Sequence, residues 1–191
     1  FTLPAYKARN GFQGYDRYFP QPNLFTLLDN LKIYQEMGVK GMFMESDAGV
    51  KDQLCNADVF YWALTKGMWD SSRNPEYLVR DYCRAYYGKG GDDIFAYFKQ
   101  LSDAYDQDPV KVGFFMGKIA KQSFFSYKLA SDLRKLIDSA ASKVAGDPVM
   151  EERVQRAGAS LDIATLFYLN RFTAEYKYSY SNLVGFSFDR K

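Results

Sequence analysis

The chain has 191 residues, 47% of them hydrophobic and 25% charged, which is typical of a globular protein with a sizeable core. Its net charge is +2, and Lys and Arg are scattered among Asp and Glu, so no basic stripe indicates a nucleic acid partner. The chain contains no His, which excludes Ser-His-Asp and Cys-His nucleophile systems and imidazole metal ligands within it. Proton transfer would therefore need carboxylates or Tyr.

Aromatic residues make up 18% of the chain and are mostly Tyr and Phe. This enrichment has two interpretations, a Tyr-rich helical core or side chains that stack on sugar rings, because Tyr combines a flat apolar face with a polar tip. Cys55 and Cys83 fit no zinc or redox spacing, so we expect buried free thiols and predict no metal site and no cofactor. No run of about 18 apolar residues occurs, so no membrane span is predicted.

The first candidate site residues lie near the start of the chain, in a loop broken by Gly11 and Gly14. Tyr15 and Asp16 belong to a run of aromatic and charged residues at 14–19. Because loops on rigid scaffolds often carry function, this run is a candidate ligand contact. The alternative is that Asp16 is an ordinary surface charge.

The next segment predicts a helix, a strand and a second helix. Leucines recur at helical spacing from residue 24, and this helix is expected to end before Gly38. The nearly continuous apolar run Val39–Met44 predicts a strand buried on both faces. Period two places Phe43 and Glu45 on one side of that strand.

Glu45 is the foremost candidate in this segment, because chemistry collects at the C-terminal ends of strands in barrels and doubly wound sheets. Asp47 follows in a polar loop at residues 46–53. The alternative role for Glu45 is a strand-end carboxylate that pairs with a lysine or caps the next loop.

A run of helices follows. The second helix is expected over residues 54–69, with Trp69 packing near its end, and Asn74-Pro75 marks the start of a third. Its buried stripe is expected to be Leu78, Val79, Tyr82, Cys83 and Tyr86. Further helices are predicted from Ile94 to Tyr105, over 124–144, and as one long helix after Asp147-Pro148 that extends through Phe172.

We therefore predict a mainly α chain with a small α/β portion. Residues 1–70 would form the α/β portion and residues 71–191 a helical domain. One strand cannot form a sheet by itself, so its partners are expected upstream of Phe1 or in another chain. We accordingly expect a processed chain or the C-terminal part of a longer one.

An ordered series of motifs resembles a family of uncharacterised, glycoside-hydrolase-like bacterial proteins that carry a domain-of-unknown-function label. Two of them are Gly-Val-Lys-Gly-Met-Phe-Met-Glu at 38–45 and Ala-Leu-Thr-Lys-Gly-Met-Trp-Asp at 63–70, and further matches fall at 22–24, 30–34, 78–83 and 86–88. The resemblance covers residues 20–105 and continues more loosely to about residue 170. These proteins are similar to α-glucuronidases and β-hexosaminidases.

The resemblance implies the last strand and helix of a (β/α)8-type barrel, followed by a helical domain. In β-hexosaminidases the last barrel strand ends in an aromatic residue, one further residue and a glutamate that contacts sugar hydroxyls. Phe43-Met44-Glu45 is similar, with Phe where Trp is usual. Residues before Glu45 offer no adjacent acid pair, whereas glycoside hydrolysis needs two carboxyl groups at a defined separation. We therefore expect an incomplete active site in this chain.

The predicted function is the C-terminal portion of a carbohydrate-active enzyme, a glycoside hydrolase acting on a polysaccharide or glycan. Tyr15, Asp16, Phe43, Glu45 and Asp47 would line its substrate cleft, and the rest of the barrel would be supplied by upstream sequence or another chain. The resemblance implies a periplasmic or extracellular location. The alternative is a non-catalytic, helical glycan-binding or scaffold protein.

Overall fold

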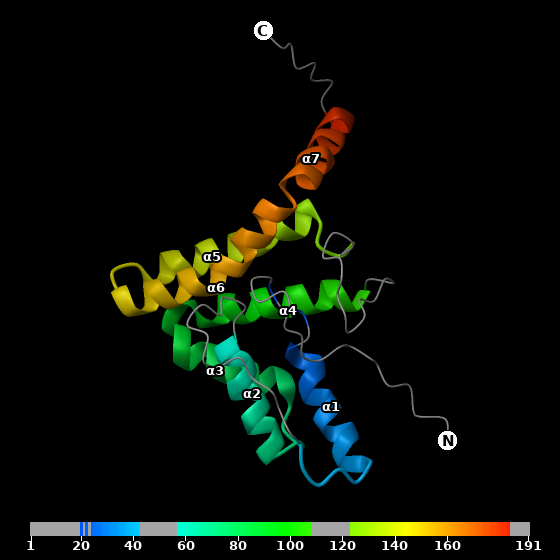
Figure 1. Cartoon of the computed structure of the whole chain (residues 1–191). Helices are drawn as coiled ribbons and strands as arrows, with labels where there is room; N and C mark the ends of the chain where they lie inside the picture. Colours follow the sequence, from blue (N-terminus) through cyan, green and yellow to red (C-terminus); the bar gives the residue numbers. More distant parts are fainter. Residues whose placement is uncertain (1–19, 21, 23, 43–56, 108–122, 184–191) are drawn as a thin grey trace.

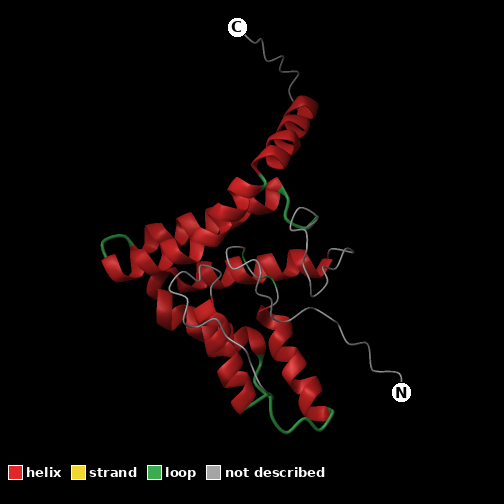
Figure 2. Cartoon of the chain, in the orientation of Figure 1, coloured by secondary structure: helices red, strands yellow, loops and turns green. Residues whose placement is uncertain are grey.

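The computed structural model describes residues 20, 22, 24–42, 57–107 and 123–183 (Figure 1). Within these residues all regular secondary structure is helical, as Figure 2 shows. The α-helices are α1 (Leu24–Glu36), α2 (Ala57–Trp69), α3 (Pro75–Tyr87), α4 (Gly91–Gln107), α5 (Tyr127–Val144), α6 (Pro148–Phe167) and α7 (Leu169–Leu183), with one 3-10 turn, η1 (Gly88–Gly90). The predicted mainly helical class is confirmed. The barrel fragment is not supported, because the described residues contain no strand.

The predicted strand at Val39–Met44 is wrong for its described part, residues 39–42, which have no regular secondary structure. The reason is the way α1 ends. Gly38 has a φ of 82°, its N–H donates to Gln35 O at 3.0 Å, and the N–H of Val39 donates to Tyr34 O at 3.0 Å. These two bonds form a Schellman motif, so Val39 caps the helix instead of entering a sheet. Val39 is 43% exposed, whereas a doubly buried strand was expected.

Helices α1 and α2 pack side by side and run in the same direction (Figure 1). Near the end of α2, a Cβ on Gly67 would lie 2.7 Å from Leu28 and 2.8 Å from Leu31 of α1. In the turn that follows α2, Ser71 Oγ donates a hydrogen bond to Gln35 Oε1, near the end of α1. Positions later in this part of the chain thus meet later positions of α1, as expected for a parallel pair. Glycine at position 67 permits this close approach.

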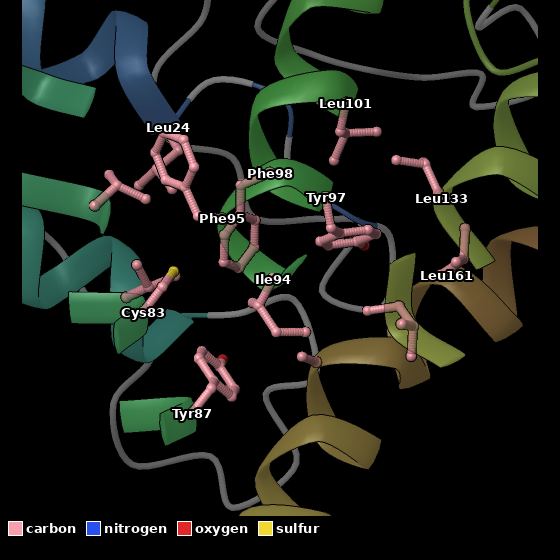
Figure 3. Close-up of a cluster of buried hydrophobic side chains, with 14 of the residues drawn as sticks. Leu24, Cys83, Tyr87, Ile94, Phe95, Tyr97, Phe98, Leu101, Leu133 and Leu161 are labelled. Atoms are coloured by element: carbon pink, nitrogen blue, oxygen red, sulfur yellow. The ribbon is translucent and has the colours of Figure 1, made fainter. Parts of the chain in front are cut away.

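Helix α4 lies at the centre of the core (Figure 3). Its buried side chains meet α3 on one side, where Cys83 and Tyr87 lie, and α5 and α6 on the other, where Leu133 and Leu161 lie. The apolar residues of α4 at this centre are Ile94, Tyr97, Phe98 and Leu101. The prediction that Cys83 is a buried free thiol is confirmed. The helix predicted from Ile94 to Tyr105 is likewise confirmed as part of α4.

The predicted helix starts at Asn74 and Asp147 are confirmed by their cap hydrogen bonds. Asn74 Oδ1 accepts from Tyr77 N at 3.0 Å, and Asp147 Oδ1 accepts from Val149 N and Met150 N at 3.1 and 3.2 Å. Such a side-chain cap contributes about 1 kcal/mol to helix stability. The sequence alone thus located two helix starts correctly.

Three details of the helices differ from the prediction. The fifth helix begins at Tyr127 rather than at residue 124, because Ser126 Oγ caps it by accepting from Leu129 N. In α3, Tyr87 is fully buried and Tyr86 is only partly buried, because α3 packs against α4 and η1 on the side that carries Tyr87. The long helix after Asp147 breaks at Tyr168, whose buried ring packs on Phe125 and Phe172.

The prediction that Trp69 packs near the end of α2 is also wrong, because its side chain is 92% exposed. The physical reason is the orientation of α2. Gly67 faces α1, and at 3.6 residues per turn Trp69 points about 160° away from Gly67 around the helix axis. The face of α2 that carries Trp69 is therefore turned outward.

Candidate functional site

The five site residues predicted from the sequence, Tyr15, Asp16, Phe43, Glu45 and Asp47, lie outside the described residues. The structure therefore does not test whether these five residues lie close together. What it does describe is the pair of helices on either side of residues 43–56, because α1 and the chain to Met42 precede this segment and α2 follows it. The candidate cleft residues of that segment remain a prediction.

The described residues do assemble a different group of side chains, which we call the aromatic ladder: Trp62 of α2, Tyr82 and Tyr86 of α3, and the cations Lys66 and Arg153 at its two ends. The ring centroids of Trp62 and Tyr82 lie 5.3 Å apart, and those of Tyr82 and Tyr86 are stacked at 5.1 Å. Lys66 Nζ lies 5.8 Å from the Trp62 ring, and Arg153 Cζ lies 4.2 Å from the Tyr86 ring. A row of rings with a cation at each end thus joins α2, α3 and α6.

Local helix geometry positions each member of the ladder. Tyr82 and Tyr86 are four residues apart on α3, and Trp62 and Lys66 are four residues apart on α2, so each pair shares one helix face. Arg153 reaches α3 from α6, and its guanidinium donates to the backbone oxygen of Tyr86 at 2.8 Å. This hydrogen bond fixes the guanidinium over the ring.

Burial sets the protonation state of the groups around the ladder. Burial raises the pKa of the Tyr82 phenol, and the nearby Asp58 carboxylate raises that pKa further. Burial also raises the pKa values of Tyr87 and of the Cys83 thiol. These groups therefore stay protonated at neutral pH, so Tyr82 is a hydrogen-bond donor and Cys83 is not an activated nucleophile.

The rings and cations of the ladder contact one another, so they join α2, α3 and α6. Cation–π contacts of this kind contribute about 0.5–1 kcal/mol each at exposed positions. In the part of the chain that the structure describes, no group of three or more Asp, Glu or Cys side chains could hold a metal ion. Among the same residues, no helix has the length and apolar character needed to cross a bilayer.

Sequence reasoning did not single out the ladder. One signal was present, because Trp62 and Lys66 fall at helical spacing within one predicted helix, as Tyr82 and Tyr86 do within the next. The partnership between Arg153 and Tyr86 had no such signal, since 67 residues separate them. Only the packing of α6 against α3 brings those two side chains into contact.

The described residues thus define a class, a mainly helical protein in which packed aromatic rings and cations join three helices. Residues 12–99 match a family described as Domain of unknown function (DUF4838), and this match includes α1–α3 and the first half of α4. It supports the predicted relationship of this part of the chain to a domain-of-unknown-function family. No curated protein and no solved structure matches the chain, so the relationship to glycoside hydrolases remains a prediction.

Proposed function

We propose that the chain is the C-terminal portion of a carbohydrate-active enzyme, a glycoside hydrolase, in which α1 and α2 flank a substrate-contacting segment at residues 43–56. Glu45 would accept hydrogen bonds from sugar hydroxyls, and Tyr15, Asp16, Phe43 and Asp47 would also line the cleft. The remaining barrel strands and the catalytic acid pair would come from upstream sequence or from another chain. The family resemblance also gives a periplasmic or extracellular location.

The observation that carries the proposal is the parallel packing of α1 and α2. Two parallel helices in direct contact need a connection that returns the chain from the end of the first to the start of the second. In βα-repeat proteins a strand makes that return, because parallel strands require helical crossovers. The parallel contact of α1 and α2 near Gly67 supports a unit of this kind.

The experiment compares Glu45→Gln with the native protein in its full natural length. A panel of aryl glycosides and oligosaccharides is screened for turnover, and the saccharide that is hydrolysed is then titrated. Loss of a hydrogen bond to a charged group costs about 1.5–3 kcal/mol, so saccharide affinity is expected to fall about tenfold to a hundredfold. The melting temperature is expected to stay unchanged.

Asp29→Asn is the matched control, because Asp29 is an exposed carboxylate on α1. This variant is expected to bind and turn over the saccharide like the native protein. Equal affinity and turnover in the Glu45→Gln variant and in the control would contradict the role given to Glu45. Absence of both hydrolysis and binding across the panel would contradict the enzyme proposal itself.

A second candidate function is a non-catalytic, helical glycan-binding or scaffold protein. The exposed indole of Trp69 favours it, since 92% of that residue is open to contact, while the buried tyrosines and the cysteine of α3 stay protonated at neutral pH. Binding of a saccharide without any turnover by the full-length protein would favour this second candidate over the first.

A further inference from the structure

Two polar side chains lie inside the hydrophobic core. Tyr97 of α4 and Ser160 of α6 are both 0% exposed. Within the described residues, neither the Tyr97 phenol oxygen nor Ser160 Oγ has a hydrogen-bond partner of ordinary geometry. Buried hydroxyl groups are almost always hydrogen-bonded in native proteins, so the presence of this pair needs a physical reason.

The two hydroxyl groups are neighbours. Burial raises the pKa of the Tyr97 phenol, and the nearby Ser160 hydroxyl opposes that rise by stabilising the phenolate as a hydrogen-bond donor. Tyr97 extends from α4 toward Leu161, the residue that follows Ser160 (Figure 3). A hydroxyl hydrogen rotates about its C–O bond, so a small adjustment of either side chain completes a hydrogen bond between the two.

The buried face of α6 offers the Tyr97 phenol one side-chain partner. Of the residues that the structure describes as buried in α6, Ser160 alone has a polar side chain. The positions one turn away on the same face are Ala157 and Ala164. A slip of α6 by one turn in either direction would therefore bring a methyl group to the Tyr97 phenol.

Two other contacts fix α6 against α5 rather than against α4. Glycine at position 158 lets α6 approach α5, since a Cβ there would lie 3.0 Å from Ile137 Cγ2. An ion pair between Arg134 and Asp162 also joins α5 to α6, but both side chains are partly exposed, and ion pairs in contact with water contribute little. The two buried hydroxyl groups instead join α4 to α6 through the core.

We propose that Tyr97 and Ser160 form a buried polar lock, in which one hydrogen bond between their hydroxyl groups selects a single register of α6 over α4. In this register each hydroxyl bonds the other, whereas a one-turn slip would leave both unbonded in an apolar core. The same register sets Arg153 of α6 over the Tyr86 ring. The lock specifies the arrangement of the helices more than it adds net stability, and it does not depend on the carbohydrate function proposed above.

The test is a double-mutant cycle in the full-length protein, with Tyr97→Phe, Ser160→Ala and the variant that carries both, measured by urea unfolding. Each single variant leaves one hydroxyl buried without its partner, so the folding equilibrium constant is expected to fall about fivefold to a hundredfold. The double variant leaves neither hydroxyl unbonded, and its loss is expected to be smaller than the product of the two single losses. Tyr77→Phe is the matched control, because Tyr77 is 72% exposed on α3, and it is expected to unfold like the native protein.

Methyl NMR reports the register itself. Ile137 and Leu161 are each expected to give one set of methyl resonances in the native protein and additional sets in the double variant, because the polar pair no longer opposes a slip of α6. The inference is overturned if the two single losses multiply to that of the double variant, since the hydroxyls would then act independently. It is also overturned if the double variant keeps one set of resonances, since the pair would then contribute no specificity.

Discussion

Helices α4 and α7 have similar amounts of aromatic and polar sequence but opposite surroundings. Helix α4 is enclosed by α3, α5 and η1 and also meets α1, and its side chains Ile94 and Tyr97 are completely buried. Helix α7 meets α6 and the beginning of α5 and then extends away from the other helices (Figure 1). Leu169, at its start, is 53% exposed. The comparison teaches that the position of a helix in the fold, and not its composition, decides how much its apolar residues stabilise the protein.

The largest expected effect comes from removing the same side chain in the two regions. Leu101→Ala removes a side chain of α4 that is only 1% exposed, and this variant is expected to lose about 2–5 kcal/mol of unfolding free energy. Leu169→Ala in α7 is expected to change it by less than about 0.5 kcal/mol. Urea unfolding followed by circular dichroism measures both. Equal losses would show that α7 is as tightly packed as α4.

The next effect tests how closely α4 approaches α3. A Cβ on Gly91 would overlap the Cys83 backbone oxygen and lie 2.7 Å from Arg84 Cα, and backbone atoms cannot move aside as a side chain can. Gly91→Ala is therefore expected to lower stability by about 1–3 kcal/mol. Gly41→Ala is the control, since no atom lies within 4 Å of the added Cβ. Thermal unfolding measures the pair, and a neutral Gly91→Ala would refute the close approach.

A smaller and local effect is expected at the attachment of α7. The Arg171 guanidinium donates to Phe125 O and lies 4.0 Å from the Tyr168 ring, and Glu175 Oε2 accepts from Tyr127 N at 2.7 Å. Arg171→Ala is expected to speed amide hydrogen exchange in α7 while exchange in α4 stays slow, since α4 opens only when the whole domain unfolds. Mass spectrometry of exchanged peptides measures this. Parallel changes in both helices would contradict the separation of the two regions.

The smallest effect concerns the solvent side of α5. Hydrogen bonds from Lys128 and Lys135 lower the pKa of Asp132 from 3.8 to about 2. Because the pKa in the folded protein is below that in the unfolded chain, the stabilisation is present above about pH 4 and is lost as the pH falls through 2. Asp132→Asn is therefore expected to lose slightly less stability than the native protein between pH 5 and pH 2.5. Urea unfolding at the two pH values checks this, and identical losses would contradict it.

Much of the fold could be predicted because helices carry local signals. Leucine spacing gave α1, and Asn74-Pro75 and Asp147-Pro148 gave the starts of α3 and α6. The predicted strand was wrong for residues 39–42. A short apolar run after a glycine has the same sequence pattern whether it enters a sheet or caps a helix. The break at Tyr168 was missed for a related reason, since ring packing on Phe125 interrupts a periodicity that continues in the sequence.

The candidate sites divide in the same way. The helical spacing of Trp62, Lys66 and Trp69 can be seen in the sequence. The exposure of Trp69, however, depends on the contact of Gly67 with Leu28 and Leu31 of α1. The roles of Glu45, Phe43 and Asp47 rest on the sequence and its resemblance alone.

The sequence by itself determined the mainly helical class, the caps at Asn74 and Asp147 and most of the buried stripe of α3, because capping and amphipathic spacing act within a few residues of each other. The tertiary structure decided which tyrosine of α3 is buried, where Trp69 points, and that Arg153 covers Tyr86. These outcomes depend on contacts between helices that are distant in the chain. Such contacts follow from how whole faces pack together, which no local pattern encodes.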